Sequence, residues 1–126
     1  MLVLDSGGIS RLAERSARAL ALIRSLRLAE LWPPVVPTMV LVESLQARPG
    51  RDANVNRFLK TCILEEAVPL VLARRAAELR RRAGRGSAVD ALVAAIAEPC
   101  GTILTADVHD LAALTAHAED VAVLPV

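Results

Sequence analysis

The chain has 126 residues, 54% of them apolar, and a formal net charge of +1. This length and composition indicate one folded domain, residues 1–126, with a substantial core, and they exclude a disordered chain. Trp32 and Phe58 are the only aromatic residues, which argues against a protein that binds single strands by stacking bases on aromatic side chains.

Short apolar runs alternate with longer amphipathic segments along the whole chain. The expected elements, in chain order, are a strand at 2–5, one helix at 10–28, a strand at 35–36, helices at 39–46 and 51–62, a weak strand at 63–67, helices at 70–83 and 88–98, a strand at 102–105, a helix at 110–118 and a strand at 121–124. Ser10, Thr38 and Ser87 are expected as N-caps, and Gly84 as a helix stop. Arg48-Pro49-Gly50 is expected to be a turn. Strands alternating with helices predict an α/β fold with a short, mostly parallel sheet flanked by helices.

Four acidic residues stand where apolar sequence would otherwise dominate. Asp5 and Asp107 follow apolar runs, so we expect both at the carboxyl ends of buried strands, whereas Glu43 and Asp90 lie in apolar helical segments. Ligands of open α/β sheets bind in the crevice outside the carboxyl ends of the strands. Carboxylates gathered there predict a site for a hard cation.

Each acid also has a structural interpretation. Asp90 is placed to complete a capping box with Ser87, and Asp107 and Asp110 are placed to cap a following helix, so capping and metal binding both remain open for these three. Asp5 precedes a flexible turn, which favours a site over a cap. Glu43 has apolar neighbours around most of its helix, so we expect it to be partly buried, which is costly without a cation.

Arginine supplies 14 of the 15 basic residues, and six of these lie close together in one stretch. The stretch contains Arg74, Arg75, Arg80, Arg81, Arg82 and Arg85. Its guanidinium groups suit phosphate recognition along a nucleic acid, and a solvated helix face is an equal alternative.

Several other classes of site are excluded by spacing. Neither His109 nor His117 has the serine context of a Ser-His-Asp hydrolase, and the chain has no phosphate-cradling loop. Cys62 and Cys100 are too few for a zinc site, so we expect buried thiols in a reducing, cytoplasmic compartment. No segment is expected to cross a membrane.

Four segments, in order along the whole chain, resemble a known family. They are residues 2–6 (Leu-Val-Leu-Asp-Ser), 36–43 ending in Val42-Glu43, 87–95 around Asp90, and 103–107 (Ile-Leu-Thr-Ala-Asp) with Asp110. Together they are similar to PIN-domain ribonucleases, and most closely to the VapC-type toxins of bacterial toxin–antitoxin pairs. The resemblance departs from the family pattern at Gly7-Gly8 and at His109.

The resemblance implies a PIN-like three-layer sandwich and a metal-dependent endoribonuclease that hydrolyses RNA phosphodiester bonds. Asp5, Glu43, Asp90 and Asp107 would be catalytic and hold one or two Mg²⁺ or Mn²⁺ ions, with Asp110 as an auxiliary ligand. Ser6 and Thr105 would support the site through their hydroxyl groups.

The resemblance also implies partners. These are an RNA substrate, a cognate antitoxin that wraps the toxin and inhibits it, a second copy in a homodimer, and larger toxin–antitoxin assemblies. Trp32 and the first helices are candidates for docking an amphipathic antitoxin segment, and ordinary core packing is the favoured alternative for most of their apolar residues. The alternative from another class is a catalytically inert PIN-fold module that acts through protein or RNA contacts.

Overall fold

Five short parallel strands form the central sheet in the computed structural model, which describes residues 1–126. The strands are β1 (Leu2–Leu4), β2 (Val35–Pro37), β3 (Ile63–Glu65), β4 (Thr102–Thr105) and β5 (Ala122–Pro125), in the spatial order β3-β2-β1-β4-β5. All neighbouring pairs are parallel, and Leu4 of β1 lies opposite Leu104 of β4. The predicted α/β class, a short parallel sheet flanked by helices, is confirmed.

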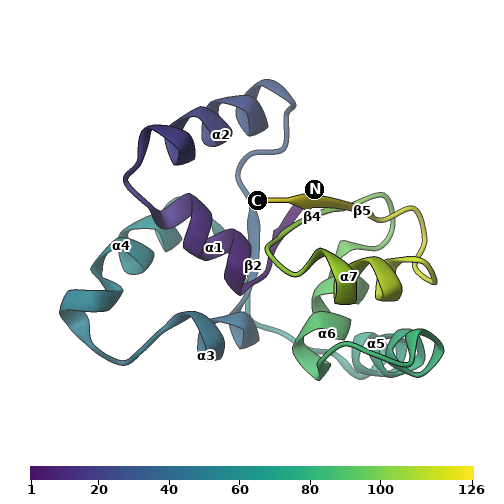
Figure 1. Cartoon of the computed structure of the whole chain (residues 1–126). Coiled ribbons are helices and arrows are strands. Elements are labelled where there is room, and N and C mark those ends of the chain that lie inside the picture. The colour runs from purple at the N-terminus through teal and green to yellow at the C-terminus, as the bar shows by residue number, and fades with distance from the viewer.

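Seven α-helices cover the two faces of the sheet (Figure 1). They are α1 (Ser6–Ala13), α2 (Ala17–Leu28), α3 (Leu41–Ser44), α4 (Pro49–Leu59), α5 (Leu70–Ala83), α6 (Ala88–Ala97) and α7 (Val108–Thr115). Helices α1 to α4 pack together on one side, and α5 to α7 pack on the other. The central strands β1 and β4 are apolar on both faces, since helices cover both, and β1 is completely buried at the centre of the core. The edge strand β3 is largely exposed.

The helix expected at residues 10–28 is two helices, and Ser10 is not its N-cap. Asp5 caps α1 instead, so this helix begins at Ser6. The Ser16 hydroxyl then accepts a hydrogen bond from the Ala19 N–H (3.1 Å) and starts a second helix. Each of these two helices therefore begins where a side chain, that of Asp5 or Ser16, accepts a hydrogen bond from a free backbone N–H group of the first turn.

The segment between β2 and β3 also differs from its prediction. Thr38 begins a 3₁₀ turn (Thr38–Val40) without capping it through its side chain, and the helix expected at 39–46 is reduced to α3. The turn expected at Arg48-Pro49-Gly50 is the start of α4, where proline at the first position loses no hydrogen bond.

The second half of the chain follows the predictions closely. Helix α5 ends at Gly84 in the left-handed conformation (φ 65°), and Ser87 caps α6 with the predicted capping box. The last helix begins at Val108, two residues earlier than expected, because Asp107 caps it.

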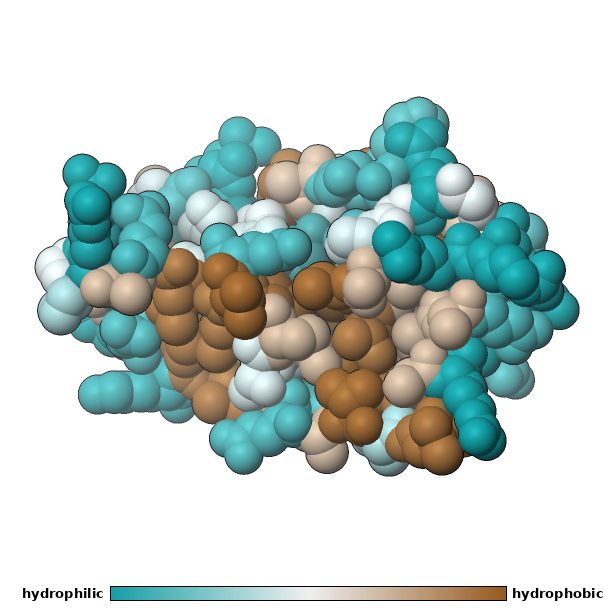
Figure 2. Space-filling view, turned by 90° about the horizontal axis from the view of Figure 1, so that it is seen from below, coloured by the Kyte–Doolittle hydropathy of each residue, from teal (hydrophilic) through white to brown (hydrophobic).

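The surface is partly apolar. Figure 2 shows apolar side chains gathered in a band across the face seen from below. Exposed large apolar side chains occur on α3, on β3 and around the start of α5; they include Val42, Ile63, Leu64, Val68, Leu70 and Val71. None of the helices has both the length and the apolar character needed to cross a membrane.

The two cysteines differ in environment. Cys62 is half-buried, and burial raises the pKa of its thiol to about 11, so it stays protonated at neutral pH. Cys100 is exposed, so the prediction that both thiols are buried is wrong for this residue. It follows the end of α6 and lies outside the core.

Candidate active site

The strand order reverses at β1, and this is where the acidic residues gather. From β1 the chain proceeds to β2 and β3 on one side of the sheet, and later to β4 and β5 on the other. The carboxyl ends of β1 and β4 therefore flank the switch point of the sheet. Asp5 directly follows β1, and Asp107 follows β4 by two residues, which is the expected location for a ligand crevice.

Asp5 is the most deeply placed of the candidate carboxylates. Its side chain is buried, with Oδ1 accepting a hydrogen bond from the Gly8 N–H (2.6 Å) and Oδ2 accepting one from the Thr105 hydroxyl. Desolvation raises the pKa of the Asp5 carboxyl above its ordinary value of 3.8, and the Asp90 charge adds to this rise, while both hydrogen bonds oppose it. The Thr105 hydroxyl therefore orients one oxygen of the Asp5 carboxylate.

Asp5 is also the N-cap of α1, so the interpretation that it lies outside a helix cap is wrong. The turn after it is tightly packed. A Cβ at Gly7 would lie 2.5 Å from the Ala106 Cβ, and one at Gly8 would lie 2.3 Å from the Leu104 carbonyl oxygen. Gly7-Gly8, a departure from the family pattern, is thus required because the first turn of α1 crosses the end of β4.

A chain of polar contacts links Asp5 to the start of α7. The Asp107 N–H donates to Thr105 Oγ1 (2.8 Å), and Asp107 Oδ1 accepts from the Asp110 N–H (3.2 Å). Asp110 accepts a hydrogen bond from Arg85 Nε (2.6 Å). Asp107 therefore has the capping role that was left open, and Asp110 forms an ion pair with the Arg85 guanidinium group.

Asp90 faces the same region from the opposite layer. Its Oδ2 accepts the Ser87 N–H (2.8 Å), and the Ser87 hydroxyl accepts the Asp90 N–H (3.0 Å), which confirms the capping box. The Asp90 carboxylate is close enough to Asp5 to contribute to the raised pKa of Asp5. Asp90 therefore both caps α6 and lies near a second acid, Asp5.

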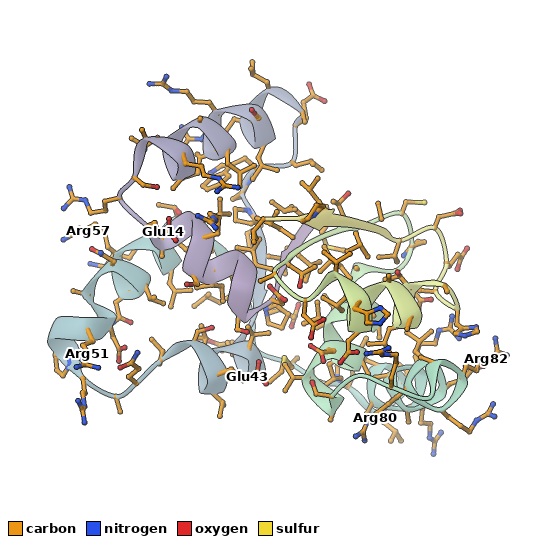
Figure 3. All side chains as sticks on the ribbon, viewed as in Figure 1. Glu14, Glu43, Arg51, Arg57, Arg80 and Arg82 are labelled. Carbon is orange, nitrogen blue, oxygen red and sulfur yellow. The ribbon has the colours of Figure 1, made fainter.

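Glu43 is exposed, so the prediction of a partly buried glutamate is wrong. The short helix α3 has no buried residue, and its apolar Val42 faces solvent. Glu43 lines a polar cleft of about 430 Å³ together with Ser6 and Gly7, which directly follow Asp5. It therefore borders the acidic region from the edge (Figure 3).

The chemistry of these side chains fits a hard divalent cation, although the side chains are not assembled around one. No three His, Cys, Asp or Glu side chains form a metal-binding group in this arrangement. Of the five candidate carboxylates, only Asp110 makes an ion pair. A buried Asp5 with a raised pKa, a second acid nearby and no basic partner would be stabilised by a cation with oxygen ligands.

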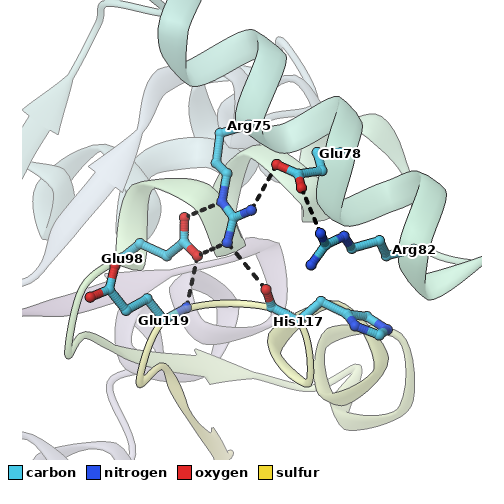
Figure 4. Close-up of polar contacts among 6 residues, drawn as sticks. All are labelled: Arg75, Glu78, Arg82, Glu98, His117 and Glu119. Carbon is cyan, nitrogen blue, oxygen red and sulfur yellow. Dashed lines mark hydrogen bonds and ion pairs between the residues drawn. The ribbon is translucent and has the colours of Figure 1, made fainter.

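Half of the arginine stretch is engaged in ion pairs within the protein. Arg75 donates to Glu98 through Nε (2.8 Å) and Nη2 (2.6 Å), to Glu78 through Nη1 (2.9 Å), and to the His117 carbonyl (3.2 Å). Figure 4 shows this network, in which Arg82 also pairs with Glu78. Arg85 pairs with Asp110. These three guanidinium groups are thus paired within the protein, an arrangement that neither the phosphate-binding nor the solvated-face interpretation predicted.

Replacing Glu98 with Gln is expected to destabilise the protein by about 2 kcal/mol at neutral pH, because a charge-assisted pair with Arg75 is lost. The hydrogen bond from Arg75 lowers the pKa of Glu98. This contribution is therefore present above the ordinary pKa of the carboxyl and is lost as the pH falls through its lowered folded value. Denaturant unfolding at several pH values should show the two proteins converge in acid.

The matched control is Arg82→Gln, which removes the exposed pair with Glu78. Its expected cost is below about 1 kcal/mol. Equal effects for the two variants would contradict a structural role for the Arg75–Glu98 pair.

Sequence reasoning did not predict the roles of three residues near the site. Arg85 pairs with Asp110 across 25 residues, and no local pattern indicates such a contact. Asp52 is buried and accepts the N–H groups of Gln46 (3.0 Å) and Arg48 (3.1 Å). An acid three positions inside a helix that starts with proline was the available signal. Arg51 lines the same polar cleft as Glu43.

The comparisons with known proteins bear on the fold. No family model matches the sequence, and no curated protein matches it. Among solved structures, the chain is similar to FitAcB from Neisseria gonorrhoeae, with a TM-score of 0.65 and 21% sequence identity over 98% of this chain and 96% of that one. This likeness extends over the full length and supports the α/β fold.

Proposed function

We propose that the protein is a Mg²⁺- or Mn²⁺-dependent endoribonuclease of the toxin type, held inactive by a cognate antitoxin. The observation that carries the proposal is the buried Asp5 carboxylate at the switch point of the sheet, beside Asp90 and without a basic partner. The resemblance of the four sequence segments to VapC-type toxins and the full-length likeness to FitAcB support the same conclusion.

Asp5, Glu43, Asp90, Asp107 and Asp110 would hold the cation. When bound, the cation would supply a water of lowered pKa able to attack phosphorus at neutral pH. Thr105 fixes the orientation of Asp5 through its hydroxyl, and Arg85 fixes that of Asp110. Without a cation the gathered carboxylates repel phosphate, so the resting site disfavours RNA.

The test is cleavage of total cellular RNA by the purified protein with Mg²⁺ or Mn²⁺, beside an EDTA control, with fragment ends mapped. Fragments with 5′-phosphate and 3′-hydroxyl ends are expected, since water is the attacking group. Asp90→Asn should lower the cleavage rate by about 100-fold or more, because a carboxylate near Asp5 is lost.

Asp120→Asn is the matched control, because Asp120 is exposed and lies just before β5, at the amino end of the sheet. It should cleave like the wild type. A folded wild-type protein that binds Mn²⁺ and cuts no RNA would favour the inert binding module. The existing caps at Asp90 and Asp107 are the observations that favour that second candidate.

The partners belong to the same proposal. A cleft of about 360 Å³ lies between α1, α2 and α4 and is lined in part by Leu12, Trp32 and Phe58, which supports docking of an amphipathic antitoxin segment. The apolar side chains exposed around β3 and the start of α5 support a homodimer, since a patch of this kind favours association.

A further inference from the structure

The polar cleft beside the acidic residues has lining residues that the proposed chemistry does not use. Its volume is about 430 Å³, and it lies between the first turns of α1 and the segment from α3 to α4. Ser6, Ser10, Ser44 and Gln46 line it, and only two of its ten lining residues are apolar. The volume lies in the range of small-ligand sites, and the lining suits a polar ligand.

Three charged residues line the cleft, namely Glu43, Arg51 and Asp52. Glu43 lies at the end near Asp5, and Arg51 is the only basic residue among the lining residues. Figure 3 shows Glu43 on α3 and Arg51 at the far end, near the start of α4. Arg51 is exposed, and its only side-chain contact is a long hydrogen bond of 3.4 Å to Gln46. Its guanidinium group is therefore available to a ligand.

The wall that carries Arg51 is held in a defined shape. Asp52 is 6% exposed, and its two oxygens accept the N–H groups of Gln46 and Arg48. These bonds fix the α3 to α4 connection against α4 and give each oxygen of the Asp52 carboxylate a backbone donor. The position of the adjacent Arg51 backbone is thus determined before any ligand arrives.

We propose that this cleft binds the sugar–phosphate backbone of the RNA substrate beside the scissile bond, with Arg51 holding a phosphate at the end away from Glu43. This inference rests on the proposed ribonuclease function. Serine hydroxyl groups and the Gln46 amide supply hydrogen bonds to ribose and phosphate oxygens. The absence of aromatic lining residues makes this a backbone subsite, with little selection among bases.

The test measures binding of a labelled single-stranded RNA of mixed sequence to the Asp90→Asn protein, in which cleavage is expected to be slow, at several salt concentrations. Adding Arg51→Ala is expected to weaken binding about 10-fold at low salt. It should also reduce the slope of log affinity against log salt by about 0.7, the value for one phosphate contact on a single strand. Arg51→Lys should keep most of the slope because the charge remains.

The matched control is Arg24→Ala, an exposed arginine on α2 that lines no cleft. It should leave both affinity and slope close to those of the Asp90→Asn parent. Equal effects of Arg51→Ala and Arg24→Ala would overturn the subsite while leaving the ribonuclease proposal intact. No RNA binding by the parent protein, together with no cleavage by the wild type, would overturn both.

Discussion

Replacing Asp5 with Asn is expected to lower metal-dependent RNA cleavage by about 1,000-fold while leaving the fold at least as stable at neutral pH. The loss corresponds to about 4 kcal/mol of transition-state stabilisation, since a carboxylate is removed from the proposed cation site. Stability is kept because Asn still accepts the Gly8 N–H as an N-cap and no longer carries a buried charge.

The pH dependence of stability gives the second readout for Asp5. Its pKa is raised in the folded state, so the contribution of this group to stability is fully present below its ordinary pKa of 3.8. That contribution is lost as the pH rises through the raised folded value. The wild type should therefore lose stability relative to Asp5→Asn over this range, and urea unfolding at several pH values measures the difference.

Divalent cations separate the catalytic role of Asp5 from a structural one. Mn²⁺ should raise the melting temperature of the wild type, because it binds the folded state, and should have a much smaller effect on Asp5→Asn. If Asp5→Asn cleaves RNA at the wild-type rate, Asp5 has no role in the reaction. A variant markedly less stable than the wild type at neutral pH would show that capping is its main role.

Gly8→Ala is expected to destabilise the protein by about 3 kcal/mol, the upper range for overpacking a core. The new Cβ would lie 2.3 Å from the Leu104 carbonyl oxygen, which belongs to the buried backbone of β4 and has no room to move. To avoid this clash, α1 would have to shift away from the sheet, which would also disturb the hydrogen bond from the Gly8 N–H to Asp5. Thermal unfolding should show a fall of about 10 °C.

Gly50→Ala is the matched control, because a Cβ at Gly50 has no atom within 4 Å and the residue is helical. It should be neutral or stabilise the protein by about 0.5 kcal/mol. A Gly8→Ala protein as stable as this control would contradict the close packing of α1 on β4.

Sequence reasoning was most accurate where one local pattern determines one element. The apolar runs predicted β1 and β4 correctly, and Ser87 with Asp90 predicted the start of α6. It failed where two local signals compete. Ser10 and Asp5 are both residue types that cap helices, and in the structure Asp5 starts the helix, with Gly8 packed against β4.

The candidate site was predictable in composition and only partly in geometry. Strand-end carboxylates at Asp5 and Asp107 followed from apolar patterning and the rules of parallel sheets. The exposure of Glu43 could not be predicted from the sequence. Helix α3 is a single turn with no buried residue, so the apolar neighbours of Glu43 do not enclose it. The Arg85–Asp110 pair joins distant segments, which no local signal reports.

The bond between Thr105 and Asp5 joins residues 100 positions apart, and this separation has a consequence for the timing of activity. Contacts so distant along a chain form only after the intervening loops have closed. During synthesis, β1 emerges first but its partner β4 emerges near the end, so Asp5 has no Thr105 to orient it until almost the whole chain has been made. The acidic site around Asp5 can therefore be complete only when synthesis of the chain is nearly finished.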